Sequence, residues 1–545
     1  MDLKGNPFYL DDAQIAWVET TLSGMTAQEK VGQLFLVMGQ DYEPERLLSM
    51  VRSGRVGGVL FRPEKTQAIC ERYAPLDAAA RIPLLHAANL EEGGAGAASD
   101  ATCFGFPMMV AASDDAQAVE RFARVCAVEG RRAQVNWTFS PVSDLDLNSL
   151  NPITNVRTYG SDVKRVMRCT LRYMQTVQAC GVAACAKHFP GDGVDGRDQH
   201  LHPTYNTLGA KEWYETYGAV YRNLIEGGLL SVMAGHIAAP HVEMEMDPRK
   251  TPDQCLPASL NPTLLQGVLR DRLGFNGLIA TDATIMGGYC MAMPRREALP
   301  ASVMAGCDML VFSTDFEEDF SFLMEALADG RLTQERLDEA VRRILALKAR
   351  VCVGETETQE VPSRRWRREC ADKAVTLVKA IQPDALPISP GKYPLVRLIV
   401  QGRDDICDGS MTGIAAAWLE RAGYAVEVYD PYADGLHGVA QARRDRLTLY
   451  LSNYEQASNQ TVVRAGWCKK HALDIPRFLN EETCVYVSFG NPYLLRDVPR
   501  VKTYINAYTA TRDTIEVTLE KLSGYGGFTG VSPVDAFCGL MDTRF

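Results

Sequence analysis

The apolar residues of this chain fall into short continuous runs that alternate with segments of helical pattern. Continuous apolar runs of this length are typical of parallel strands that are buried on both faces. Eight such units within residues 1–352 predict a (β/α)8 TIM-like barrel, although an open doubly wound sheet has the same local pattern. The eight runs are Leu34–Met38, Val56–Phe61, Pro83–Ala87, Val135–Phe139, Val182–Ala186, Leu230–Ala234, Gly277–Thr281 and Met309–Phe312.

An amphipathic helix and a change in composition mark the end of the predicted barrel. Leu337, Val341, Ile344, Leu345 and Lys348 are spaced three and four residues apart, which predicts a helix with one buried face. The polar segment 353–369 that follows is predicted to be a linker. The barrel domain is therefore expected to span residues 1–352.

Residues 370–545 resume the alternation of apolar runs and helical segments. A helix is expected at Thr412–Ala422, because Gly423 follows it in the position of a C-cap. This part is predicted to be a second, smaller α/β domain. Its strand candidates are Leu395–Val400, Ala425–Tyr429, Leu447–Leu451, Val485–Phe489 and Thr503–Ala507.

The composition of the chain excludes some classes of binding partner and predicts where the protein is located. The chain is 46% hydrophobic and 23% charged, with a formal net charge of -11, and these values argue against nucleic acid and anionic membranes as partners. We find no signal-peptide pattern at the N-terminus and no apolar segment long enough to span a bilayer. Fifteen cysteines without CxxC pairs predict reduced thiols, a cytoplasmic location and no structural zinc. We expect no cofactor.

Residues that could line a site lie at or shortly after the carboxyl ends of six of the eight apolar runs. Because barrel strands converge at their carboxyl ends, these residues are expected to form one site. They are Asn89, Glu91 and Glu92 after the third run, Asp144 and Asp146 after the fourth, Lys187 and His188 after the fifth, Met233 and His236 around the end of the sixth, Asp282 after the seventh and Asp315 after the eighth.

The loop 186–203 is the richest in titratable groups, and five of the eight histidines lie between His188 and His241. Asp198 precedes His200 by two residues. A carboxylate bonded to one ring nitrogen favours the charged imidazole, which makes the other nitrogen a competent acid near neutral pH. Three alternatives stay open: His200 as a capped loop residue, a metal site of Asp198, His200 and His202, and His202 as the working histidine.

Asp282 follows an apolar run directly. Burying an unpaired carboxylate costs several kcal/mol unless cations or donors surround it, and Lys187, Arg157 and His188 are candidates for that role. An ionised Asp282 could act as a nucleophile or stabilise a cation. The alternative is a helix N-cap, a position that favours Asp.

Three further residues are candidates for binding a ligand. Lys187 and His188 place two donors at a strand end, which suits the hydroxyl groups of a polyol. Arg157 could bridge a ligand and a carboxylate, or form a structural salt bridge. Met233 could line the pocket as an apolar wall, or pack in the core.

The loop AKHFPGDGVDGRDQH resembles the K-H-F-P-G-x-G-x(4)-D-x-H loop of family 3 glycoside hydrolases, in particular their bacterial β-N-acetylglucosaminidase branch. The segments TFSPVSDLDLNSLNPITNVRTYGSD, SVMAGHI, LIATDATIMGG and AGCDML match the family in the same order. The resemblance implies a retaining mechanism in which Asp282 forms a covalent glycosyl-enzyme. It implies that His200, oriented by Asp198, is the acid and then the base. Arg157, Lys187 and His188 match sugar-binding positions, and Met233 matches a position beside the sugar.

The chain departs from the family pattern in the loop after the third run and in the long loop. The family usually has D-x-E-G-G where this chain has Asn89-Leu90-Glu91-Glu92-Gly93-Gly94, so Asn89 or Glu91 is the candidate to replace the missing Asp. Asp192 stands where a His is frequent, and Gln199 where Ser or Thr is frequent. We expect these differences to affect which sugar is preferred and not the chemistry of the reaction.

The resemblance leads us to expect an exo-acting β-N-acetylhexosaminidase that removes terminal N-acetylglucosamine from a small carbohydrate or glycopeptide. A phosphorylase and a β-glucosidase are alternatives on the same scaffold. A non-catalytic sugar-binding relative and a metal-dependent hydrolase are alternatives from other classes.

Overall fold

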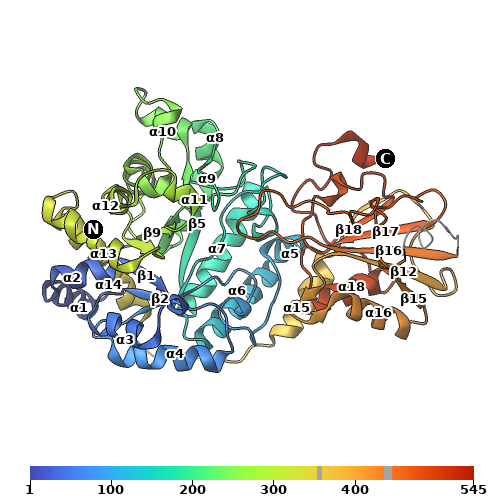
Figure 1. Cartoon of the computed structure of the whole chain (residues 1–545), viewed down its shortest axis with the longest axis horizontal. Coiled ribbons are helices and arrows are strands. Elements are labelled where there is room, and N and C mark those ends of the chain that lie inside the picture. The colour runs from blue at the N-terminus through green and yellow to red at the C-terminus, as the bar shows by residue number, and fades with distance from the viewer. Residues whose placement is uncertain (353–358, 435–444) are drawn as a thin grey trace. The chain divides into compact units, whose positions relative to one another are not determined.

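A computed structural model describes residues 1–352, 359–434 and 445–545 (Figure 1). The chain divides into two compact units. The barrel unit comprises residues 1–102, 120–151 and 163–361, and the sheet unit comprises residues 103–119, 152–162 and 362–545.

The barrel unit contains eight parallel strands that close on themselves, in the order β1-β10-β9-β7-β5-β4-β3-β2. This confirms the predicted TIM-like fold over the open sheet, and each of the eight predicted runs contains or overlaps one strand. Almost every residue of these strands is buried, which is why the runs read as continuously apolar. The strands are β1 (Phe35–Met38), β2 (Gly58–Leu60), β3 (Leu85–Ala88), β4 (Trp137–Thr138), β5 (Ala183–Phe189), β7 (Ser231–Ala234), β9 (Leu278–Ala283) and β10 (Met309–Val311).

Helices surround these strands in the barrel unit (Figure 1). The amphipathic stripe predicted around Leu337–Lys348 lies on α14 (Gln334–Val351), where all five of its residues are buried. The other helices are α1 (Asp12–Ser23), α2 (Ala27–Gln33), α3 (Pro44–Arg52), α4 (Thr66–Ala79), α6 (Ala116–Arg132), α7 (Val163–Ala179), α8 (Ala210–Glu215), α9 (Tyr217–Glu226), α10 (Pro240–Met246), α11 (Gly287–Cys290), α12 (Arg295–Ala305), α13 (Phe316–Asp329) and the π-helical segment Thr263–Arg272.

The sheet unit is built on a six-stranded sheet of order β11-β18-β17-β16-β12-β15. All five predicted strands are present. The sixth, β11, is antiparallel to β18 and was not predicted. The strands are β11 (Thr376–Ala380), β12 (Leu395–Gly402), β15 (Ala425–Val428), β16 (Arg446–Asn453), β17 (Thr483–Ser488) and β18 (Thr503–Asn506).

Both faces of this sheet are covered. On one face, α15 (Ser363–Ala374), α16 (Met411–Arg421) and α18 (Arg512–Leu522) pack against residues such as Leu398, Leu449 and Val487. On the other face, Tyr450, Tyr486 and Tyr504 stack with ring centroids 5.5 and 5.7 Å apart. The sheet unit thus has two cores of its own.

The units are not divided where the sequence placed the domain boundaries. Residues 103–119 and 152–162 belong to the sheet unit, although both segments precede the end of the barrel. Within the predicted linker 353–369, residues 353–358 lie outside the described residues, and α15 begins at Ser363. Arg367 of that helix is buried and forms ion pairs with Asp408 at 3.1 Å and Asp513 at 2.5 Å.

In the parts of the chain that the structure describes, every helix is too short or too polar to cross a membrane. All fifteen cysteines are free.

Candidate active site

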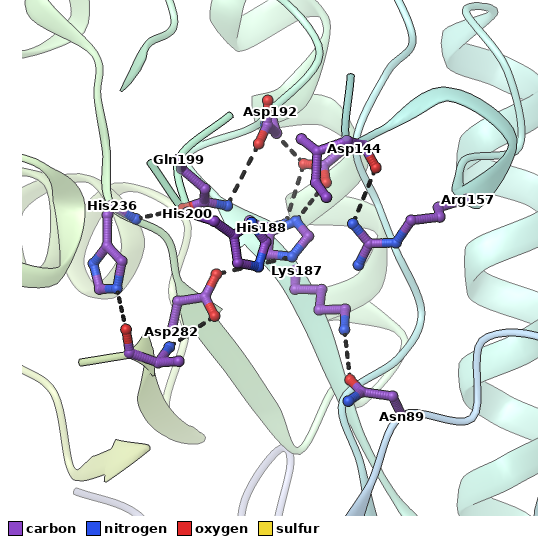
Figure 2. A network of polar contacts seen from close by, with 12 residues as sticks. Asn89, Asp144, Arg157, Lys187, His188, Asp192, Gln199, His200, His236 and Asp282 are labelled. Carbon is purple, nitrogen blue, oxygen red and sulfur yellow. Dashed lines mark hydrogen bonds and ion pairs between the residues drawn. The ribbon is translucent and has the colours of Figure 1, made fainter. Parts of the chain in front are cut away.

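The site begins at the carboxyl end of β5, where Lys187 and His188 are both buried. The Lys187 Nζ donates to Asn89 Oδ1 at 2.9 Å and pairs with Glu91 Oε1 at 2.5 Å. Leu90 between them is fully buried. The two candidates to replace the family's Asp, Asn89 and Glu91, therefore both contact Lys187. Figure 2 shows the contact between Asn89 and Lys187.

His188 lies between two carboxylates. Its Nδ1 is 2.7 Å from Asp144 Oδ2, and its backbone N–H donates to Asp144 Oδ1 at 3.1 Å. Its Nε2 lies 3.9 Å from Asp282 Oδ2. Because Asp144 accepts a hydrogen bond from Nδ1, the ring keeps a fixed orientation, with Nε2 turned toward Asp282.

Asp282 lies within strand β9, five residues before the first residue of α11, and Met286 is the N-cap of that helix, so Asp282 is not a helix N-cap. Its Oδ1 accepts from the Ala283 N–H at 2.8 Å, whereas Oδ2 is buried and has no hydrogen-bond partner among the described residues. Burial, the largest influence, would raise the pKa of this carboxyl. His188, His236, His200 and the Ala283 N–H together outweigh burial and leave the pKa below its ordinary value. Asp282 is therefore ionised at neutral pH.

The predicted Asp–His pair is present. His200 Nδ1 lies 2.6 Å from Asp198 Oδ1, and the same oxygen accepts the His200 backbone N–H at 2.8 Å. The Asp198 side chain is fully buried, whereas 22% of the His200 side chain is exposed. The Gly287 N–H donates to the His200 carbonyl at 2.8 Å, which joins this loop to the segment after β9.

The remaining candidates lie in different surroundings. Met233 is buried on β7, opposite Ala280 of β9. Arg157 ends the short 3-10 helix Asn155–Arg157 of the sheet unit, and its Nη1 donates to the Ile153 carbonyl at 3.1 Å. His202 is exposed. Within residues 1–352, 359–434 and 445–545, no three His, Cys, Asp or Glu side chains are grouped as metal ligands.

One expected member of the mouth has a different role. Asp315, which follows the eighth run, caps α13 by accepting the backbone N–H groups of Glu317 and Glu318 at 3.0 and 3.1 Å. An Asp ahead of a helix satisfies donors that the helix itself leaves free, and this local role explains the residue.

Three further buried residues join the network: His236, which was expected at the mouth of the barrel, and Gln199 and Asp192, to which no site role was assigned. Gln199 accepts the His236 backbone N–H at Oε1 and approaches Asp192 with Nε2 (Figure 2). Burial first, and then the Asp144 charge, raises the pKa of Asp192 to about 7 against the opposing influence of His188 and the donors from Gly193 and Asn151. Burial also lowers the pKa of His236. His236 could be predicted because it follows the sixth apolar run. The contacts of Gln199 with His236 and Asp192 could not be predicted from the sequence.

The fold and the site together define the class. The chain has a closed parallel barrel with a buried, ionised carboxylate and an Asp–His pair at its carboxyl end, where barrel enzymes carry their active sites. Residues 26–347 match the family model "Glycosyl hydrolase family 3 N terminal domain". The protein belongs to glycosyl hydrolase family 3 and is an enzyme of that family.

Related proteins extend the match to the whole chain. A "Beta-N-acetylglucosaminidase/beta-glucosidase" from Cellulomonas fimi is 41% identical, with all of both chains covered. The solved structure of the "Beta-glucoside phosphorylase BglX" bound to 2FGlc has a TM-score of 0.92 and 41% identity over 99% of both chains. A family 3 β-N-acetylglucosaminidase from Paenibacillus sp. str. FPU-7 shares the fold, with a TM-score of 0.79 and 24% identity over 95% of this chain and 100% of that one.

Proposed function

We propose that the protein is a retaining exo-glycosidase that releases terminal β-linked N-acetylglucosamine through a covalent glycosyl-enzyme on Asp282. The observation that carries this proposal is the state of the Asp282 carboxylate. One oxygen is held by a backbone N–H, and the other is buried without a hydrogen-bond partner among the described residues. A desolvated oxygen beside imidazoles, on a group that stays ionised, has the properties of a nucleophile.

In the first step, Asp282 Oδ2 attacks the anomeric carbon while the bond from that carbon to the leaving oxygen breaks. The electron pair of the broken bond goes to the leaving oxygen, which takes a proton from Nε2 of the His200 imidazolium. Asp198 stabilises the charged ring through Nδ1 before this transfer. An Asp–His pair thus takes the place of the second carboxylate of most retaining glycosidases.

In the second step, neutral His200 removes a proton from a water molecule as that water attacks the anomeric carbon. The bond between the anomeric carbon and Asp282 breaks, and the carboxylate is regenerated. The two displacements each invert the anomeric carbon, so the released sugar keeps the β configuration.

The sugar hydroxyl groups are proposed to bind Lys187 and His188, with Glu91 holding the Lys187 ammonium in place. Met233 is proposed to lie beside the sugar and Arg157 to contact it, as the family pattern implies. Both assignments rest on sequence position.

The choice of N-acetylglucosamine is supported by the loop pattern and by the relative from Cellulomonas fimi, whose name includes both β-N-acetylglucosaminidase and β-glucosidase. A panel of 4-nitrophenyl β-glycosides tests it. We expect kcat/KM to be highest for the N-acetylglucosaminide. A higher value for the glucoside would make the protein a β-glucosidase, and binding without turnover would indicate a non-catalytic relative.

Phosphate is the second candidate for the acceptor. The solved relative with 41% identity is titled a phosphorylase. After the first step the group proposed to face the acceptor is a neutral imidazole, and its carboxylate partner Asp198 lies behind it, so an approaching phosphate is farther from a negative charge than it would be from a catalytic carboxylate. Turnover that rises with added phosphate and yields a sugar 1-phosphate would establish phosphorolysis, whereas turnover independent of phosphate would establish hydrolysis.

A further inference from the structure

The Gln199 side chain connects the loop of the acid–base pair to two strand ends of the barrel. Gln199 stands between Asp198 and His200 in the chain and is fully buried. Its Oε1 accepts the His236 N–H at 2.8 Å, just past β7, and its Nε2 donates to Asp192 Oδ2 at 3.4 Å, just past β5 (Figure 2). Gln199 and Asp192 are the two departures from the family pattern in this loop, and they contact each other.

We propose that Gln199 is a positioning residue that holds His200 in place relative to the nucleophile. The proposal rests on the function proposed above, in which His200 is the acid and base. Gln199 does not touch the reacting atoms and acts through the backbone of the residue that follows it.

Hydrogen bonds connect His236, and through it Gln199, to Asp282. His236 Nε2 lies 3.0 Å from the Ala283 carbonyl, which can only accept, so this nitrogen carries the proton and Nδ1 accepts from the Ser259 hydroxyl at 2.8 Å. The Ala283 N–H in turn donates to Asp282 Oδ1 at 2.8 Å. Three hydrogen bonds therefore connect Gln199 to the nucleophile by way of two intervening residues, His236 and Ala283.

The contact to Asp192 leads to the residues that are proposed to hold the sugar. Asp192 Oδ1 is fixed by Asn151 Nδ2 at 2.9 Å and by the Gly193 N–H at 2.7 Å. The Asp192 backbone N–H donates to Asp144 Oδ1 at 2.8 Å, and Asp144 orients His188. The Gln199 side chain thus fixes the position of the acid–base loop relative to two parts of the site. These are the proposed sugar-binding residues at the end of β5 and the nucleophile on β9.

Gln199 is closely packed against two glycines, Gly235 and Gly288. A Cβ on Gly235 would lie 3.2 Å from Gln199 Oε1, and a Cβ on Gly288 would lie 2.6 Å from the Gln199 carbonyl. Ser or Thr, which are frequent at this position in the family, end one atom beyond Cβ and are too short to reach both partners. The long amide is therefore what makes the double attachment in this chain.

Substitution of Gln199 tests the proposal through its dependence on the leaving group. We expect Gln199→Ala to lower kcat/KM by about 10–100-fold for a β-linked disaccharide that needs a proton on its leaving oxygen. For a 2,4-dinitrophenyl glycoside, which needs none, kcat/KM should fall less than about 3-fold. Equal losses on both substrates would overturn the proposal.

Two further variants separate positioning from packing. Gln199→Met keeps the length of the side chain and removes its hydrogen bonds, so it should behave as Gln199→Ala does. Wild-type behaviour of the Met variant would overturn the proposal. Gln178→Ala is the matched control, because Gln178 likewise accepts a backbone N–H (Leu230, 3.1 Å) and donates to a carbonyl (Gly228, 2.9 Å), but before β7 rather than after it.

A double variant tests whether Gln199 acts through His200. In a His200→Ala background, Gln199→Ala should change kcat/KM less than about 2-fold, because the group it positions is already gone. A further large loss there would show that Gln199 acts elsewhere.

Hydrogen–deuterium exchange gives a readout that does not depend on activity. Gln199→Ala should speed amide exchange at residues 198–202 and 287–288 about 10-fold or more, with little change in the sheet unit. Unchanged exchange would overturn the positioning role. A wild-type protein that cleaves no glycoside would overturn the proposed function while this exchange experiment still decided the attachment of the loop.

Discussion

The Nε2 atom of His188 lies 3.9 Å from Oδ2 of Asp282, the carboxylate oxygen with no hydrogen-bond partner among the described residues. The opposite nitrogen of the ring is bonded to Asp144. His188 thus presents a fixed dipole, or a charge when protonated, to the proposed nucleophile, and together with His236 and His200 it keeps the pKa of Asp282 low in spite of burial. This relationship explains how a buried carboxylate stays reactive.

Replacing the nucleophile should abolish turnover and preserve binding. We expect Asp282→Asn to lower kcat by about 10⁴-fold or more, because the amide cannot form the covalent intermediate. The Kd for the sugar should change little. A 2-deoxy-2-fluoro glycoside with a good leaving group should add its glycosyl mass to the peptide that contains Asp282, and labelling of any other carboxylate would contradict the assignment.

Removing the acid should slow poor leaving groups selectively. We expect His200→Ala to lower kcat/KM by about 10²–10⁴-fold for disaccharides and far less for activated aryl glycosides, which depart without a proton. Asp198→Asn should act in the same direction, since it removes the charge that stabilises the imidazolium. Added azide should restore the second step in His200→Ala, and a glycosyl azide of retained configuration is the product to look for. Equal losses for all leaving groups would rule out His200 as the acid.

The ion pair between Glu91 and Lys187 should matter for both stability and binding. The Lys187 side chain is only 4% exposed, so Glu91→Gln leaves an ammonium group in the interior with reduced compensation. We expect a loss of about 3 kcal/mol in the free energy of unfolding, and a higher KM. The double variant Glu91→Gln, Lys187→Met removes both charges and should recover part of the stability without recovering activity. A single variant as stable as wild type would show that the pair is not needed.

Lys348 is not one of the proposed site residues, and it should make the free energy of unfolding depend on pH. Its Nζ is buried with the Gln33 amide oxygen as partner at 2.6 Å, and burial lowers the pKa of Lys348 to about 7. Between about pH 7 and 10 the unfolded chain keeps a proton that the folded protein has lost, so the free energy of unfolding rises with pH.

We therefore expect Lys348→Met to be more stable than wild type at pH 6, where the cost of burying the charge is complete. Each unit by which the pKa is lowered should add about 1.4 kcal/mol to the stability gained by the variant. The loss of the hydrogen bond to Gln33 should reduce the total gain once, by about 1 kcal/mol. The advantage should shrink toward pH 10. Thermal unfolding at pH 6 and 9.5 measures it, with Lys211→Met, at an 89% exposed lysine, as the control. An advantage that grows with pH would contradict a lowered pKa of Lys348.

Sequence alone determined the positions of the barrel strands and the pairing of two residues that are close in the chain, Asp198 and His200. All eight barrel strands were predictable because burial on both faces makes each run continuously apolar. Asp198 and His200 were predictable as partners because two residues separate them, so their contact depends on the loop alone. The edge strand β11 was missed because its polar and apolar residues are mixed and only one neighbour pairs with it.

Tertiary structure decided which distant residues meet. Asp144 and His188 are 44 positions apart, Glu91 and Lys187 are 96 apart, and Gln199 and His236 are 37 apart. Each pair forms because parallel pairing places the carboxyl ends of β3, β4, β5, β7 and β9 side by side in that order. Asp315 was expected at the mouth for the same reason but caps a helix instead. Periodicity and short spacings are properties of neighbouring residues, whereas the distances between strand ends are fixed only when the strands pair and the barrel closes.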